Sequence, residues 1–61
     1  MKLRIEIVMD NAAFDPESGT KAARILRELA GRLDGENLQW RDLRPLRDIN
    51  GNRVGEAKVI R

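Results

Sequence analysis

Apolar and polar residues alternate at the start of the chain, over residues 2–9 (KLRIEIVM). The apolar side consists of Leu3, Ile5, Ile7 and Met9. The other side consists of Lys2, Arg4, Glu6 and Val8. A period of two that includes branched residues predicts a strand with one buried face.

The apolar spacing changes to that of a helix in the middle of the chain. A stripe with the spacing i, i+3, i+4, i+7 consists of Ala22, Ile25, Leu26, Leu29, Ala30 and Leu33. Asp15 followed by Pro16 is typical of a helix N-cap with proline at the first helical position. Gly35 is a natural stop after the last turn. We therefore predict a helix over residues 16–34, with Phe14 in the core at its start.

The last third of the chain predicts a β-hairpin over residues 44–60, with its turn at NGN. A type II′ loop at Gly51-Asn52 sets Ile49 opposite Val54. A type I′ loop one residue earlier is the alternative, and it moves every pairing by two residues along the partner strand. Cross-strand complementarity favours the first register.

The predicted order is therefore strand, helix, strand, strand. A right-handed crossover with the third strand between the other two gives an α+β fold, in which one helix packs on an antiparallel sheet of order 1-3-2. Pro45 argues against a long helix and against a central strand. Residues 36–43 fit either a connector or the start of a strand. The uncovered sheet face is expected to carry Lys2, Arg4, Glu6, Val8, Arg47 and Glu56.

The length of 61 residues predicts a single small domain, 1–61, with a thin core. A domain of this size buries only about 60% of the surface that its unfolded chain exposes. The chain has no Cys and no His, which excludes a disulfide and a Cys/His metal site. Self-association is the remaining common way to stabilise such a chain.

No set of residues predicts catalysis. The chain has no Cys, His or Tyr, and its only hydroxyl side chains, Ser18 and Thr20, have no histidine to activate them. Asp10 and Asp15 are a carboxylate pair, but Asp15 is already explained as a helix cap. A thin domain also offers little room for a pocket that excludes water. We expect no enzyme activity, no cofactor and no small-molecule substrate.

One loop has a pattern that partly matches a calcium site. Asp48, Asn50 and Asn52 have the spacing of the first three ligands of a calcium-binding loop. The positions that require Gly and a bidentate Glu hold Arg53 and Val59. A phosphate-binding loop should open a helix, whereas this one lies between two strands. We therefore interpret it as a turn and expect no metal.

Basic residues gather toward the C-terminus, although 12 basic against 10 acidic residues leave the whole chain nearly balanced. The candidate interaction residues are Trp40, Arg41, Arg44, Arg47, Arg53 and Lys58. Arginine suits phosphates, and an exposed Trp stacks on bases. Nucleic-acid modules usually use two or three aromatic residues, and only Trp40 is available on this sheet. Trp40 either closes the edge of the core or anchors an interface, and the small core favours the first.

Three segments carry a resemblance: DNAAF after the first strand, AARILRELAGRL in the helix, and LRDINGNRVGEAKV at the end. With these segments the chain resembles small bacterial and prophage-type proteins that have no assigned activity. The resemblance implies a stand-alone small protein rather than a fragment of an enzyme. It supplies no catalytic or binding residues.

These observations predict a small non-catalytic protein-interaction module that binds another protein or a second copy of itself. Nucleic-acid binding through the Arg-rich hairpin is the alternative hypothesis. No apolar run approaches the roughly 20 residues of a membrane span. Arg4 and Glu6 interrupt any signal-peptide core. We therefore expect a cytoplasmic protein with no membrane partner.

Overall fold

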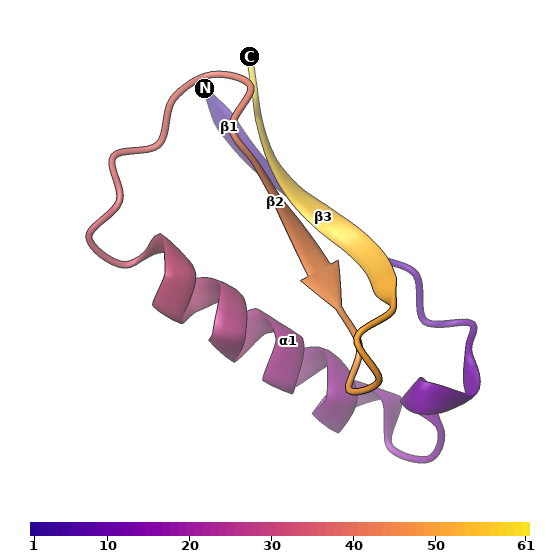
Figure 1. Ribbon diagram of the computed structural model, residues 1–61. Helices are drawn as coiled ribbons and strands as arrows, with labels where there is room; N and C mark the ends of the chain where they lie inside the picture. Colours follow the sequence, from indigo (N-terminus) through magenta and orange to yellow (C-terminus); the bar gives the residue numbers. More distant parts are fainter.

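The computed structural model describes residues 1–61 and has one helix packed on a three-stranded antiparallel sheet (Figure 1). Its elements are β1 (Lys2–Ile7), the 3₁₀ turn η1 (Ala12–Phe14), α1 (Ser18–Leu33), β2 (Leu43–Arg47) and β3 (Arg53–Ile60). The strand order is β1-β3-β2. The predicted α+β fold and strand order are confirmed.

The core lies between α1 and the strands β2 and β3. Its buried residues are Phe14, Ile25, Leu29, Leu46, Val54 and Ala57. Ile25 and Leu29 are one helical turn apart and therefore point to the same side of α1. In Figure 1 the helix runs alongside β2 and the β2–β3 hairpin. The predicted place of Phe14 in the core is confirmed.

The strand β1 is largely uncovered by α1, although its apolar residues face the helix side. Leu3 and Ile5 pair with buried residues of β3, yet each is 42% exposed. Of the apolar row that the sequence predicts to be buried, only Ile7 is half-buried. Met9 lies beyond the end of the strand and is exposed. A helix is about 10 Å wide and strands lie about 4.8 Å apart, so one helix covers two strands.

The helix α1 starts later than predicted and without the predicted cap. It begins at Ser18, and its N-cap residue is Glu17, which has φ 65° and makes no side-chain capping hydrogen bond. The Asp15–Pro16 peptide is cis, and the backbone N–H of Asp15 donates to the first carbonyl of η1 at 3.1 Å. Asp15 therefore closes η1 instead of capping α1. The predicted stop is confirmed, with Gly35 at φ 82° just after the helix.

The favoured hairpin register is wrong. Leu46 lies opposite Gly55, which is the register of the alternative type I′ turn. A register shift then sets Arg47 opposite Arg53, so that Val54 is the extra residue of a β-bulge in β3. The bulge is compatible with the burial of Val54 in the core beside Leu46.

Gly55 lies at a close approach of two strands. It pairs with Ile7 of β1 on one side and with Leu46 of β2 on the other. A Cβ atom at this position would overlap the backbone carbonyl of Glu6, which cannot move aside as the end of a flexible side chain would. The central strand therefore requires a glycine at this point.

We expect Gly55→Ala to lower the free energy of unfolding by about 1–3 kcal/mol, because β1 must shift to accommodate the methyl group. The control is Gly31→Ala on α1, where nothing lies within 4 Å of the added Cβ. That change should raise the free energy of unfolding by about 0.5–1 kcal/mol. Urea unfolding followed by circular dichroism measures both. Unchanged stability in Gly55→Ala would contradict the close approach.

Candidate interaction site

The carboxylate of Asp48 organises the hairpin loop, residues 48–52. Its Oδ1 accepts hydrogen bonds from the backbone N–H groups of Asn50 and Asn52, each at 2.9 Å. The backbone N–H of Gly51 donates to the Asp48 carbonyl at 3.0 Å, and Gly51 has φ 83°, which glycine adopts at little cost. The loop is therefore longer than either predicted two-residue turn, and it leaves Ile49 67% exposed.

The same carboxylate joins the hairpin to the connection between β1 and α1. Its Oδ2 accepts from Nδ2 of Asn11 at 3.0 Å and from Nδ2 of Asn52 at 3.3 Å. The Oδ1 atom of Asn11 accepts in turn from the backbone N–H of Ala13 at 2.8 Å and so caps η1. Donors from the protein thus occupy both carboxylate oxygens of Asp48. The spacing of Asp48, Asn50 and Asn52 therefore serves to build the turn.

Burial and hydrogen bonding act in opposite directions on Asp48. Burial by itself raises the pKa of this carboxyl group, because it disfavours the charged form. The hydrogen bonds from Asn11, Asn50 and Asn52 stabilise the ionised form and outweigh burial. The pKa of Asp48 therefore lies below its ordinary value of 3.8.

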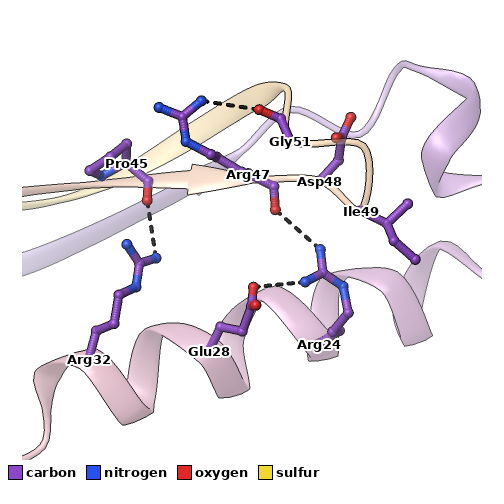
Figure 2. Close-up of a pocket in the computed structure, with 8 residues that line it drawn as sticks. All are labelled: Arg24, Glu28, Arg32, Pro45, Arg47, Asp48, Ile49 and Gly51. Carbon is purple, nitrogen blue, oxygen red and sulfur yellow. Dashed lines mark hydrogen bonds and ion pairs between the residues drawn. The ribbon is translucent and has the colours of Figure 1, made fainter.

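Two arginines of α1 cover the outer edge of β2 (Figure 2). Nη2 of Arg24 donates to the carbonyl of Arg47 at 3.2 Å, and Nη2 of Arg32 donates to the carbonyl of Pro45 at 3.1 Å. Glu28 holds Arg24 in place through an ion pair of 2.7 Å. Pro45 has no N–H to offer to another strand. This edge is therefore closed to further strand pairing.

A groove of about 440 Å³ lies between α1 and this edge. Its lining consists of Arg24, Glu28, Arg32, Pro45, Arg47, Asp48, Ile49 and Gly51. The guanidinium groups of Arg24 and Arg32 point across the groove to the strand (Figure 2). Only Nε of Arg24 is buried without a partner. The charged side chains of the groove thus serve mainly to hold α1 against β2.

The opposite edge of the sheet, along β1, is open. The backbone N–H of Val8 points inward and donates to the carbonyl of Val54 in β3 at 2.8 Å. Backbone direction alternates along a strand, so the N–H and C=O groups of Leu3, Ile5 and Ile7 point away from β3. The exposed side chains of Leu3 and Ile5 lie beside these groups. The β1 edge therefore combines unpaired backbone groups with an apolar row.

Two charges of β1 project on the sheet face opposite α1, and neither has an ion-pair partner. Arg4 lies directly opposite Lys58, and Glu6 lies directly opposite Glu56, so each faces a residue of the same sign. The ion pairs of the structure are Arg24–Glu28, Arg44–Glu36 and Arg53–Glu56. Arg4 and Glu6 are therefore free to pair with charges outside the chain.

Trp40 is not part of the core, contrary to the interpretation that the sequence favoured. It is 45% exposed in the loop that precedes β2. The guanidinium groups of Arg41 and Arg61 lie over its ring, 4.5 and 4.0 Å from the ring centre. Cation–π attraction thus holds the C-terminal residue against this loop. Two of the candidate interaction residues, Trp40 and Arg41, do lie together.

The other candidate interaction residues are distributed over different places. Arg47 and Arg53 lie opposite each other beside the hairpin loop, where their side chains bond to neighbouring residues at 3.1 and 3.2 Å. Arg44 pairs with a core residue of β3 and so lies on the helix side of the sheet, whereas Lys58 lies on the other face. The structure does not bring the six residues into one basic surface.

The sequence pattern does not reveal the residues that make the two edges different. Pro45 indicates that β2 is an edge strand, but nothing in the helix pattern points to Arg24 and Arg32 as its cover. The alternation identifies the apolar row of β1 but predicts that this row is buried. The number of predicted elements does indicate an uncovered strand, because one helix covers about two strands and three strands are predicted.

The fold and its edges define a small α+β layer protein with one closed and one open sheet edge. The chain matches no family model, no curated protein and no solved structure. The resemblance to bacterial and prophage-type proteins stays a prediction. No helix of the structure has the length and apolar character that crossing a membrane requires.

The hydrogen bonds of Asp48 predict a loss of stability in acid. The pKa of Asp48 in the folded chain is lower than its ordinary value of 3.8. The contribution of the ionised carboxylate to the free energy of unfolding is therefore complete above that value, and it is lost as the pH falls through the folded-state pKa. Asp48→Asn should be less stable than the wild type at pH 7 and should depend less on pH below 3.8. Thermal melts across the acid range measure this.

The control for this experiment is Asp10→Asn, because it leaves every hydrogen bond of Asp48 in place. This variant should lose stability at low pH as the wild type does, because Asp48 is still protonated there. Equal acid slopes in Asp48→Asn and the wild type would show that the carboxylate does not hold the loop.

Proposed function

We propose that this chain is a small non-catalytic protein-interaction module that associates through the free edge of β1. The difference between the two sheet edges carries the proposal. Arg24, Arg32 and Pro45 close the β2 edge, whereas the β1 edge has outward backbone groups and exposed apolar side chains. In strand addition, backbone hydrogen bonds supply affinity and alternate side chains supply specificity.

Self-association is the form of this interaction that the size of the core favours. Only 8 of 61 residues are buried, so the chain gains stability from any contact that removes further apolar surface from water. Burial of apolar surface contributes about 25 cal/mol per Å². Leu3 and Ile5 are the apolar residues that a strand added to β1 would cover most directly. The cytoplasmic location expected from the sequence stays a prediction.

Nucleic-acid binding stays the alternative. Its support is the exposed Trp40 with Arg41 and Arg61 beside it. The guanidinium groups over the ring occupy the surface on which a base would stack. Arg47 and Arg53 make hydrogen bonds within the hairpin rather than forming a continuous basic groove with this cluster. The β1 edge, by contrast, has exposed apolar side chains beside outward backbone groups.

Ile5→Lys tests the proposed surface, because a charge among apolar edge residues opposes strand pairing. We expect the association of the purified chain to weaken about tenfold or more, since the lysine must lose water on pairing. Sedimentation equilibrium over micromolar to millimolar concentration measures the mass. A wild-type chain that stays monomeric at high micromolar concentration would contradict the proposal.

The matched control is Leu43→Lys on β2. Leu43 is 37% exposed, close to the 42% of Ile5, but it lies on the closed edge. Its substitution should change the association constant by less than about twofold. If Leu43→Lys weakens association as much as Ile5→Lys does, the surface lies elsewhere. Circular dichroism confirms that both variants are folded.

A further inference from the structure

The order of charges along β1 is complementary to itself in an antiparallel arrangement. Arg4 and Glu6 flank Ile5 in the sequence and project on the sheet face opposite α1. Neither charge has an ion-pair partner within the chain. If a second β1 lies antiparallel with Ile5 opposite Ile5, Arg4 of each strand lies opposite Glu6 of the other. The same register sets Leu3 opposite Ile7 on the apolar face. Unlike charges and apolar pairs directly opposite each other stabilise an antiparallel sheet.

The backbone supports this register. The outward N–H and C=O groups of β1 belong to Leu3, Ile5 and Ile7, which are the residues that would pair across a two-fold axis at Ile5. Each hydrogen-bonded pair of an antiparallel ladder exchanges two hydrogen bonds. The row of free backbone groups would therefore be satisfied along most of the strand.

The neighbouring registers are less favourable. A two-fold axis at position 4 places Arg4 opposite its own copy, and an axis at position 6 places Glu6 opposite its own copy. Like charges directly opposite each other destabilise a sheet pair. Of these three axes, only the one at Ile5 places unlike charges opposite each other without also placing like charges opposite each other.

We propose that a second copy of this chain binds the free edge, with β1 antiparallel to β1 and Ile5 on the two-fold axis. This inference rests on the proposed function and names its partner and register. The product is a continuous six-stranded sheet with both helices on one face. The two β2 edges lie at its ends, where Arg24 and Arg32 close them. The assembly is therefore a closed dimer that does not grow into a fibre.

Cysteine cross-linking tests the register directly, because the natural chain contains no cysteine. In the proposed dimer the two Ile5 residues form a hydrogen-bonded pair with Cα atoms about 5.5 Å apart, within disulfide range. Ile5→Cys should form a covalent dimer under mild oxidation. In the same register the two Leu3 residues lie four positions apart along the strands, a distance of about 13 Å. Leu3→Cys should therefore not form a covalent dimer.

A charge exchange tests the pairing without cross-linking. Arg4→Glu and Glu6→Arg each place like charges opposite each other in a homodimer and should weaken it about tenfold. Within the chain each change sets an unlike charge opposite Lys58 or Glu56, so the fold is not expected to suffer. A mixture of the two variants restores both unlike pairs. It should form a heterodimer at concentrations where each variant alone is monomeric.

The outcomes separate this inference from the proposed function. A dimer that Ile5→Lys weakens, but that Ile5→Cys does not cross-link and the charge mixture does not restore, overturns the register and leaves the β1 edge as the interaction surface. A wild-type chain that stays monomeric overturns both. Cross-linking at Ile5 alone, together with restoration in the mixture, supports both.

Discussion

A single helix is about 10 Å wide and covers about two strands, and α1 lies over β2 and β3. Leu46 of β2 is fully buried in the core between α1 and the sheet. Arg24 and Arg32 bond to carbonyls of β2 and hold the helix at that side of the sheet. The third strand, β1, keeps one apolar row and one row of backbone groups unpaired as a consequence.

Two local features make this arrangement possible. The Asp48 carboxylate collects donors from the hairpin loop and from Asn11, so it fixes the end of the hairpin against the connection that leads into α1. Gly55 lets the central strand lie close to β1 without a side chain between their backbones. The bulge at Val54 adds a further apolar side chain to the core. A domain with so few buried residues depends strongly on each of them.

Long periodic patterns in the sequence predicted the elements and their order. The alternation predicted the strand β1, the helical spacing predicted α1, and Gly35 predicted where α1 ends, although Leu26 of the helical stripe is 42% exposed. Predictions failed where one residue could serve two different local structures. The backbone N–H of Asp15 closes η1 and its side chain does not cap α1, while the Asp48 carboxylate builds a longer loop in place of the expected two-residue turn. Local propensity alone does not decide between such structures, because residues such as Asp offer the backbone several alternative hydrogen-bonding patterns.

The candidate site was harder to predict than the fold. An alternating strand pattern indicates which face is apolar but not which neighbouring element covers it, so it predicts burial for Leu3 and Ile5, which are exposed. The size of Trp40 favours the core, whereas Arg41 and Arg61 hold it at the surface. The arginines that close β2 come from α1, and their role depends on the placement of the helix over the sheet.

Amide hydrogen exchange along β1, followed by NMR at increasing protein concentration, tests whether the β1 edge is free in the monomer and is covered on association. In dilute solution we expect slow exchange at the inward amides, such as Val8, and fast exchange at the outward amides of Leu3, Ile5 and Ile7. The outward amides should become protected as the concentration rises, while the edge of β2 does not change. Outward amides that exchange equally fast at every concentration would show that β1 is not the interaction edge.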